Sequence, residues 1–145
     1  MLRPEGMKDM KALRATVAGA VLLLAACGGG QTASGGPVGV TLTDKGVTLA
    51  QSSVNAGAVT FSVKNSGTIE HELVVIKTDV AADKIQPDPD EAGKMSEAGS
   101  LGESGDLAAG EAKDFTLTLT PGKYVLMCNQ PGHYMVGMHV AFEVK

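Results

Sequence analysis

Alternation of polar and apolar residues is the sequence feature that most restricts the fold of this chain. Residues 58–64 read Ala-Val-Thr-Phe-Ser-Val-Lys, and residues 114–120 read Asp-Phe-Thr-Leu-Thr-Leu-Thr. A period of two places apolar side chains on one face of a β-strand and polar side chains on the other. Both segments therefore predict strands with one buried face and one solvent-facing face.

Further apolar and β-branched segments extend this pattern along the chain. Turn signals such as Asn65-Ser66-Gly67 and Pro121-Gly122 separate them, and we find no internal repeat and little sign of helix. About seven short strands with frequent turns are typical of an all-β fold, and we predict a Greek-key β-sandwich. The predicted strands are residues 40–43, 47–51, 58–64, 69–77, 114–120, 123–128 and 139–144.

Residues 79–111 interrupt the alternation. They are rich in Asp, Glu, Gly and Ala, include the run Gln-Pro-Asp-Pro-Asp at 86–90, and lack a sustained apolar period. A connection longer than ~12–15 residues is usually functional or disordered. We expect a long acidic insertion, which is either a surface excursion between the two halves of the sandwich or an acidic docking surface for a basic partner.

The N-terminal residues have the pattern of a targeting segment. Four basic residues precede an apolar stretch at 15–26, which is too short to span a ~30 Å hydrocarbon core as a helix. The stretch ends in Leu24-Ala25-Ala26-Cys27, which resembles the bacterial lipobox. That resemblance implies cleavage before Cys27 and a diacylglyceryl group on its thiol. The alternative is an ordinary signal peptide whose small residues include a cysteine.

The segment after Cys27 supports a tethered domain. Residues 28–37 are rich in Gly and Ser, which predicts a flexible tether with a reach of roughly 15–20 Å. We therefore divide the chain into a lipoprotein signal peptide (1–26), a lipidated cysteine with its tether (27–37) and a folded domain (38–145). The expected location is outside the cytoplasm, with the domain anchored to a bacterial membrane in the periplasm or on the outer face of the cell membrane.

Composition excludes several functional classes. The net charge of the 145 residues is -4, and the chain has 3% aromatic residues and no Trp, so we expect no nucleic-acid binding. The length suits one domain, and two cysteines cannot build a disulfide-rich scaffold. We find no Ser/His/Asp set and no pair of carboxylates suited to catalysis, so the chain is not expected to be an enzyme.

Residues 128–138 gather chemically reactive side chains within one loop. They read Cys-Asn-Gln-Pro-Gly-His-Tyr-Met-Val-Gly-Met, and so supply a thiol, an imidazole and two thioethers. If Cys27 is lipidated, Cys128 is the only free thiol, which outside the cytoplasm oxidises unless something occupies it. A buried, inert cysteine is the alternative. Cys, His and Met are soft ligands that suit copper, and the Pro-Gly turn lets Cys128 and His133 face one point.

A further strong ligand is needed, and His71 in the predicted strand 69–77 is the candidate. In a sandwich that strand can lie beside the strand that carries Cys128. The pattern Cys-x4-His-x4-Met, preceded by a distant His-Glu pair, resembles the cupredoxins, the type 1 (blue) copper proteins. Its loop spacing is nearest to that of the rusticyanin- and sulfocyanin-like small cupredoxins, and the resemblance covers residues 38–145.

The resemblance implies a ligand set for one copper ion that cycles between Cu(I) and Cu(II). His71, Cys128 and His133 would be the trigonal ligands, and Met138 the weak axial ligand. Met135 is a rival axial ligand, two residues after His133. His139 is expected to face solvent, with a second weak copper contact as the alternative.

Two further expectations follow from the family pattern. The loop around His133 contains Pro131, Tyr134, Met135 and Val136, and in this family such a loop forms the exposed patch through which electrons pass. The residue after the first histidine ligand is often Asn or Ser and braces the cysteine sulfur, but here it is Glu72. An ionised carboxylate cannot donate a hydrogen bond, so this departure leaves the reduction potential open.

Together with the predicted lipid anchor, the resemblance implies a monomeric, membrane-tethered carrier of single electrons between redox partner proteins, with membrane-bound proteins among the candidates. The acidic insertion could then dock a basic redox partner. The alternative is copper capture or delivery to a membrane oxidase, for which soft donors are available at Met95, Met127, Met135, Met138 and His139. A metal-free adhesion or structural sandwich would require the ligand pattern to be accidental.

Overall fold

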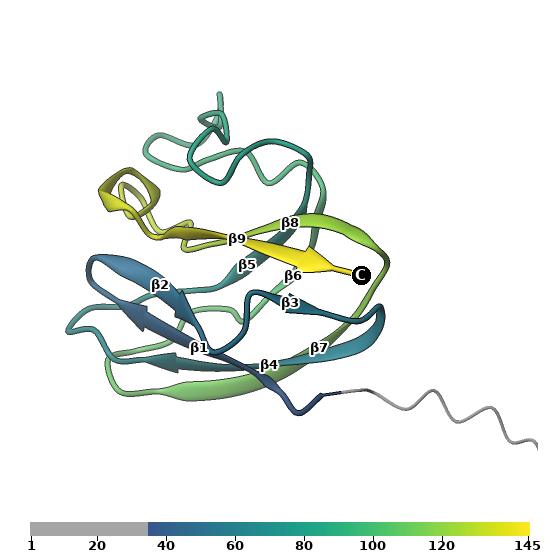
Figure 1. Cartoon of the computed structure of the whole chain (residues 1–145). Helices are drawn as coiled ribbons and strands as arrows, with labels where there is room; N and C mark the ends of the chain where they lie inside the picture. The colour runs from purple at the N-terminus through teal and green to yellow at the C-terminus, as the bar shows by residue number, and fades with distance from the viewer. Residues whose placement is uncertain (1–34) are drawn as a thin grey trace, which may run out of the picture. The chain divides into compact units, whose positions relative to one another are not determined.

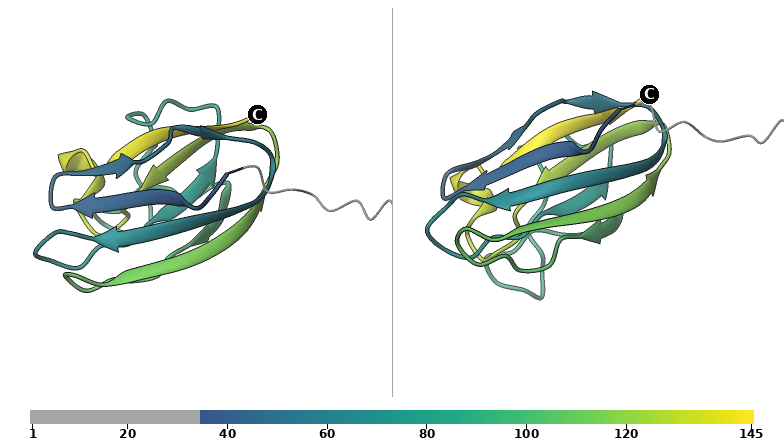
Figure 2. Two further views of the ribbon diagram at one scale, coloured as in Figure 1. Left: turned by 60° about the horizontal axis from the view of Figure 1, so that its bottom comes forward. Right: turned by 90° about the horizontal axis from the view of Figure 1, so that it is seen from below.

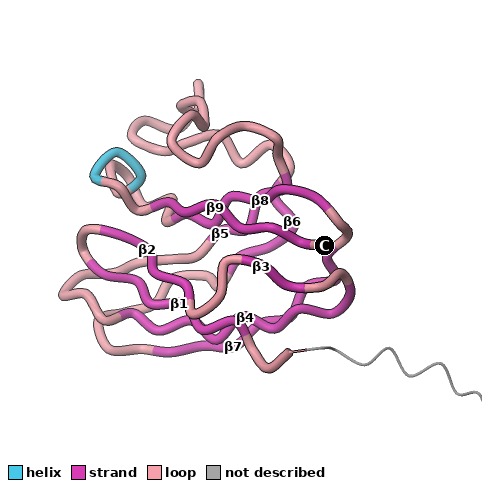
Figure 3. The backbone as a smooth tube through the Cα atoms, viewed as in Figure 1, coloured by secondary structure: helices cyan, strands magenta, loops and turns pink. Residues whose placement is uncertain are grey.

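A computed structural model describes residues 35–145, which form two β-sheets packed face to face (Figures 1 and 2). Within these residues the strands are β1 (Val38–Thr43), β2 (Gly46–Leu49), β3 (Ser53–Val54), β4 (Gly57–Asn65), β5 (Val74–Lys77), β6 (Ser100–Glu103), β7 (Ala112–Leu119), β8 (Gly122–Met127) and β9 (His139–Val144). A short 3-10 helix, η1 (Tyr134–Val136), lies in the loop between β8 and β9 (Figure 3).

The two sheets have the strand orders β2-β1-β4-β7 and β3-β9-β8-β5-β6. The pairs β1–β4 and β3–β9 are parallel, and the other pairs are antiparallel. Each sheet is therefore mixed, and the predicted all-β sandwich is confirmed.

One predicted strand differs from the structure by more than two residues at an end, and two observed strands were not predicted. The strand expected over residues 69–77 begins only at Val74, and His71 forms an isolated bridge with Leu107 through two main-chain hydrogen bonds of 3.1 and 2.8 Å. The side-chain amide of Asn65 donates to the carbonyls of Ile69 and Leu107, which holds the chain out of the regular ladder here. The strands β3 and β6 were not predicted, because one has two residues and the other lies inside the acidic insertion.

The main core lies between the two sheets. Val59, Phe61 and Val63 on β4 are buried, as the alternation predicted. The ring of Phe61 stacks on Phe115 at 5.4 Å and meets the edge of Phe142 at 5.7 Å, so it joins both sheets. Burial of each large apolar side chain contributes roughly 1.5–3 kcal/mol.

A second apolar cluster covers the outer face of β5 and β8. Val74 and Ile76 on β5, and Val125 and Met127 on β8, pack against Ile85, Met95 and Tyr134. These two strands are therefore buried on both faces, which explains their continuous apolar runs. The acidic insertion supplies Ile85, Met95 and Leu107 to the core, a contribution that its missing apolar period did not indicate.

Tyr134 fastens the insertion to the loop between β8 and β9. Its hydroxyl donates to the carbonyl of Ala82 at 2.6 Å and accepts from the N–H of Ile85 at 3.0 Å. The side chain is 5% exposed, so the expectation that Tyr134 belongs to an exposed patch is wrong. Because both hydrogen-bond partners of the hydroxyl belong to the insertion, the Tyr134 ring points toward the insertion and away from solvent.

The predicted signal peptide, Cys27 and the first part of the tether lie outside the described residues, so these assignments stay predictions. Among residues 35–145, no helix has both the length and the apolar character that a membrane crossing needs.

We predict that Tyr134→Phe loosens the insertion without unfolding the sandwich. Loss of the two hydroxyl contacts should cost about 1–2 kcal/mol and should speed amide hydrogen exchange at Ile85. The control is Tyr124→Phe, which removes a hydroxyl bond to the carbonyl of Thr120. Equal acceleration at Ile85 in both variants would show that Tyr134 does not fasten the insertion.

Candidate metal centre

Main-chain hydrogen bonds fix the loop that carries Cys128 and His133. Cys128 follows the last residue of β8, and its N–H donates to the carbonyl of Met138 at 3.0 Å. The loop is tightened further by the N–H groups of Val136 and Met138, which both donate to the carbonyl of His133 at 3.2 Å. Gly137 has a φ of 103°, a left-handed conformation that favours glycine and returns the chain to β9.

Three predicted ligands converge on one point. The Sγ of Cys128 lies 3.4 Å from Nδ1 of His133 and 3.8 Å from Nδ1 of His71, and the two Nδ1 atoms are 3.1 Å apart. Cys128 and His71 are fully buried, and His133 is half-buried. Among residues 35–145, these three side chains form the one cluster of His, Cys, Asp or Glu in which at least three donor atoms lie within 4.8 Å of one another.

The donor set fits a single transition-metal ion. Bonds of about 2.0–2.3 Å to two imidazole nitrogens and a thiolate in one plane would separate the donors by roughly 3.5–3.8 Å, close to the observed spacing. Two imidazoles and a thiolate are the trigonal donors of blue-copper sites.

Asp44 fixes the ring of His71 from behind. Its carboxylate accepts from Nε2 of His71 at 3.0 Å, and from the N–H and hydroxyl of Thr68 at 2.8 and 2.7 Å. The hydrogen bonds from Thr68, followed by that from His71, lower the pKa of Asp44 to about 2. An ionised carboxylate only accepts, so Nε2 of His71 carries a proton, and Nδ1 is the ring nitrogen that faces Cys128.

Gly67 leaves the room that this contact needs. A Cβ atom at Gly67 would lie 2.7 Å from Nε2 of His71 and closer still to Oδ1 of Asp44. Sequence reasoning missed both Asp44 and Gly67, because an acidic residue in a two-residue hairpin turn and a glycine after Asn-Ser are ordinary turn signals. Only the packing of the β1–β2 turn against residues 67–71 shows their role.

Burial sets the protonation of the metal-free centre. Burial is the main cause that raises the pKa of the Cys128 thiol. Hydrogen bonds from the backbone N–H groups of Glu72 and Gln130 partly oppose this rise. Burial, followed by the nearby His71, lowers the pKa of His133. Near neutral pH the centre therefore holds a thiol and a neutral His133 imidazole, so a metal ion must displace the Cys128 proton.

The main chain and the side chain of Glu72 make different contacts. Its N–H donates to the Sγ of Cys128 at 3.4 Å, which is the bracing contact expected at this position. Its carboxyl group lines a separate acidic pocket, where burial, with Glu103 and Asp106 adding to it, raises the pKa of Glu72 to about 7. The departure from Asn or Ser therefore leaves the contact with the sulfur in place.

Met138 and Met135 differ sharply in their surroundings. Met138 is fully buried and belongs to the same core cluster as Cys128, whereas Met135 is 73% exposed. These surroundings favour Met138 over Met135, and its role as axial ligand stays a prediction. The His139 ring lies 4.6 Å from the Tyr134 ring and outside the three-residue cluster.

Exposed apolar side chains surround His133. Met135 and Val136 in η1 are 73% and 60% exposed, and Pro131 is exposed in the preceding turn. The expected apolar surface is therefore present, with Tyr134 turned inward.

We predict that Asp44→Ala releases the His71 ring. In the metal-free protein, nitrogen chemical shifts should show His71 protonated at Nε2, and the variant should show a mixture of tautomers because the acceptor is lost. Asp114→Asn, which alters a carboxylate on β7 that is bonded to Ser62 on β4, serves as the control. An unchanged His71 tautomer in Asp44→Ala would contradict the role of Asp44.

Comparison with known proteins places the fold. No family model matches the chain, and no curated protein matches it. Among solved structures, auracyanin from Roseiflexus castenholzii is 21% identical with a TM-score of 0.56, covering 74% of this chain and 94% of that one. Auracyanin B is 24% identical with a TM-score of 0.56, covering 75% and 88%. Rusticyanin from Thiobacillus ferrooxidans is 18% identical with a TM-score of 0.55, covering 77% and 79%.

These solved structures are cupredoxins, and the likeness extends over most of each chain. The sequence resemblance rests on the ligand pattern, and the backbone fold supports it independently. The chain has the cupredoxin fold, and the side chains at its ligand positions fit a blue copper site.

Proposed function

We propose that the protein binds one copper ion and carries single electrons between redox partner proteins outside the cytoplasm. The observation that carries this proposal is the convergence of Cys128, His71 and His133 at one buried point of a cupredoxin fold. Met138 would complete the set as axial ligand. Among the similar structures, rusticyanin is described as a copper protein and auracyanin A as a blue copper protein.

Copper held by two imidazoles, a thiolate and a weak thioether would supply a one-electron couple, since this donor set suits both oxidation states. The chain's part is to keep the donors in place. The His71 ring is held by Asp44 and by the main-chain bridge to Leu107. Cys128 is held by the bond to Met138, so little would need to move when an electron is exchanged.

His133 would be the point of exchange with a partner. His133 is more exposed than His71, the other histidine of the proposed ligand set. Met135 and Val136 lie beside His133 in η1. A partner that covers these apolar side chains would exclude water from the edge of the centre. We propose that the partners are proteins, some of them membrane-bound, and that the carrier acts as a monomer without enzymatic activity.

The predicted lipid on Cys27 and the Gly/Ser tether would keep the domain close to a membrane. Two or more acyl chains give stable anchoring, since each buried CH₂ contributes ~0.8 kcal/mol. The tether would allow the domain to turn its copper site toward different partners.

Copper capture or delivery is less well supported. The extra soft donors that favour this alternative lie in different surroundings. Met95 and Met127 are buried in the apolar cluster under the insertion, and Met135 is exposed on η1.

We predict that the purified protein takes up one equivalent of Cu(II) and develops an intense thiolate-to-copper absorption band with a type 1 paramagnetic-resonance spectrum. The bands should disappear on reduction and return on oxidation. Cys128→Ser should abolish the band, whereas Cys27→Ser should keep it. A copper site without the band, or one that does not cycle, would rule out the proposed function.

We also predict that Met138→Leu retains copper and raises the reduction potential, because a weak donor to the oxidised metal is lost. Met135→Leu is the matched control, since it removes an exposed thioether from the same loop. Voltammetry of both variants gives the comparison. A wild-type potential in Met138→Leu combined with a shift in Met135→Leu would make the axial assignment wrong.

A further inference from the structure

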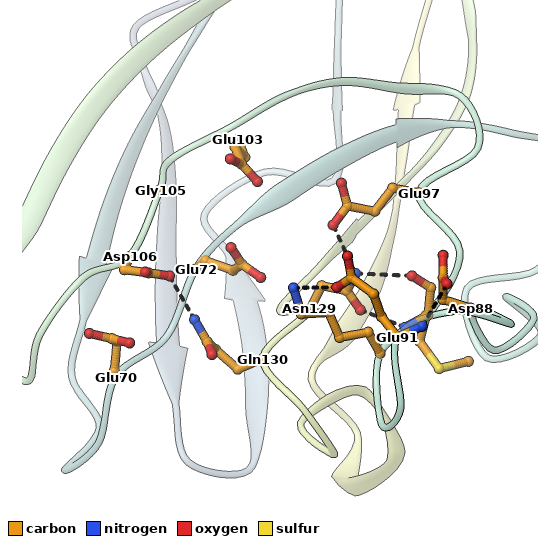
Figure 4. Close-up of a pocket in the computed structure, with 12 residues that line it drawn as sticks. Glu70, Glu72, Asp88, Glu91, Glu97, Glu103, Gly105, Asp106, Asn129 and Gln130 are labelled. Atoms are coloured by element: carbon orange, nitrogen blue, oxygen red, sulfur yellow. Dashed lines mark hydrogen bonds and ion pairs between the residues drawn. The ribbon is translucent and has the colours of Figure 1, made fainter.

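An acidic pocket lies next to the metal centre. It has a volume of about 550 Å³ and lies between residues 70–72, the acidic insertion and the residues that follow Cys128 (Figure 4). Half of the fourteen acidic residues at positions 35–145 line it, together with one basic residue, Lys94. The seven acidic residues are Glu70, Glu72, Asp88, Glu91, Glu97, Glu103 and Asp106.

Four of these carboxylates already have partners within the pocket or its rim. Glu91 pairs with Lys94 at 2.7 Å, and Asp88 accepts from the backbone N–H groups of two residues after it. The amide of Asn129 donates to Glu97 at 2.8 Å, and the amide of Gln130 donates to Asp106 at 2.6 Å. Lys94, the one basic residue that lines the pocket, is therefore already paired with Glu91, and the pocket keeps a large excess of acidic over basic side chains.

Glu70, Glu72 and Glu103 have no side-chain hydrogen bond or ion pair within the described part of the chain. Glu72 is the informative one, because it is only 8% exposed. In the view of Figure 4, its carboxyl group lies between Asp106 with Gln130 on one side and Glu97 with Asn129 on the other. A largely buried acidic group normally has a hydrogen-bonding or charged partner, and Glu72 has none among the described residues, so its carboxyl group is available to a cation from outside the chain.

We propose that the pocket receives a lysine or arginine side chain from a basic partner protein. The volume exceeds what one metal ion fills, and no three carboxylates in the described residues bring their oxygens within 4.8 Å of one another. A hard cation such as Ca²⁺ needs six to eight oxygens at close range. An ammonium or guanidinium group on a flexible stem instead bonds several separated carboxylates at once.

The location connects this pocket with the metal centre. Glu72 follows His71 directly, and Asn129 and Gln130 follow Cys128. A basic side chain bound here would hold a partner beside the centre while its apolar surface covered the residues around His133. The identity of the partner as a redox protein rests on the proposed function. Binding of a lysine or arginine side chain in the pocket does not rest on it.

The test uses the metal-free protein, a tetralysine peptide as probe and nuclear magnetic resonance titration at low ionic strength. The peptide should shift the amides of Glu72, Asn129 and Gln130, and added salt should weaken its binding. The pocket variant carries Glu72→Gln and Glu103→Gln. The control carries Asp79→Asn and Glu143→Gln, which remove the same charge from residues that line a separate pocket.

We expect the pocket variant to bind the peptide at least about tenfold more weakly and the control to change by less than about twofold. Glu70→Gln, at an exposed position, gives a second reading should the double variant fold poorly. Equal weakening in both double variants would reduce the effect to net charge and overturn the proposal. So would displacement of the peptide by Ca²⁺ at lower concentration, or no shift at the pocket. Because no copper is present, the result does not depend on the metal site.

Discussion

The hydrogen bond from the N–H of Cys128 to the carbonyl of Met138 is the interaction on which the centre depends. It continues the β8–β9 ladder by one step beyond the pair Met127 and His139, and so closes the loop at its base. Residues 129–137 must then form a loop whose two ends are held together by this bond. The loop therefore brings the His133 ring to the Cys128 sulfur regardless of what the more exposed residues of η1 contact.

The opposite side of the centre is fixed by different means. His71 lies outside the regular strands, but its main chain is paired with Leu107 and its ring is bonded to Asp44. The thiol and imidazole groups are thus held by contacts within the chain itself, and Cys128 and His71 are buried. A metal ion that binds this arrangement adds its binding free energy to folding, at the cost of one thiol proton.

The sequence was informative where a local pattern decides the structure. The alternation in β4 and β7 and the spacing of the loop after Cys128 predicted the sandwich and the side of the centre that this loop carries. Contacts between distant turns could not be predicted this way. Asp44 meets His71 only because β1 pairs with β4, and the insertion joins the core only because β5 and β8 need cover on their outer face. Short segments that depend on tertiary partners carry no periodic signal.

The acidic insertion and the metal loop act as one unit in this fold, since Tyr134 links them and Asn129 bonds both Met95 and Glu97. The central claim is that one ion is shared by Cys128, His71 and His133. X-ray absorption at the copper edge of the loaded protein tests it most directly. The account predicts one short sulfur and two nitrogen neighbours per copper, with the short sulfur lost in Cys128→Ser. A shell of oxygen and nitrogen alone in the unmodified protein would contradict it.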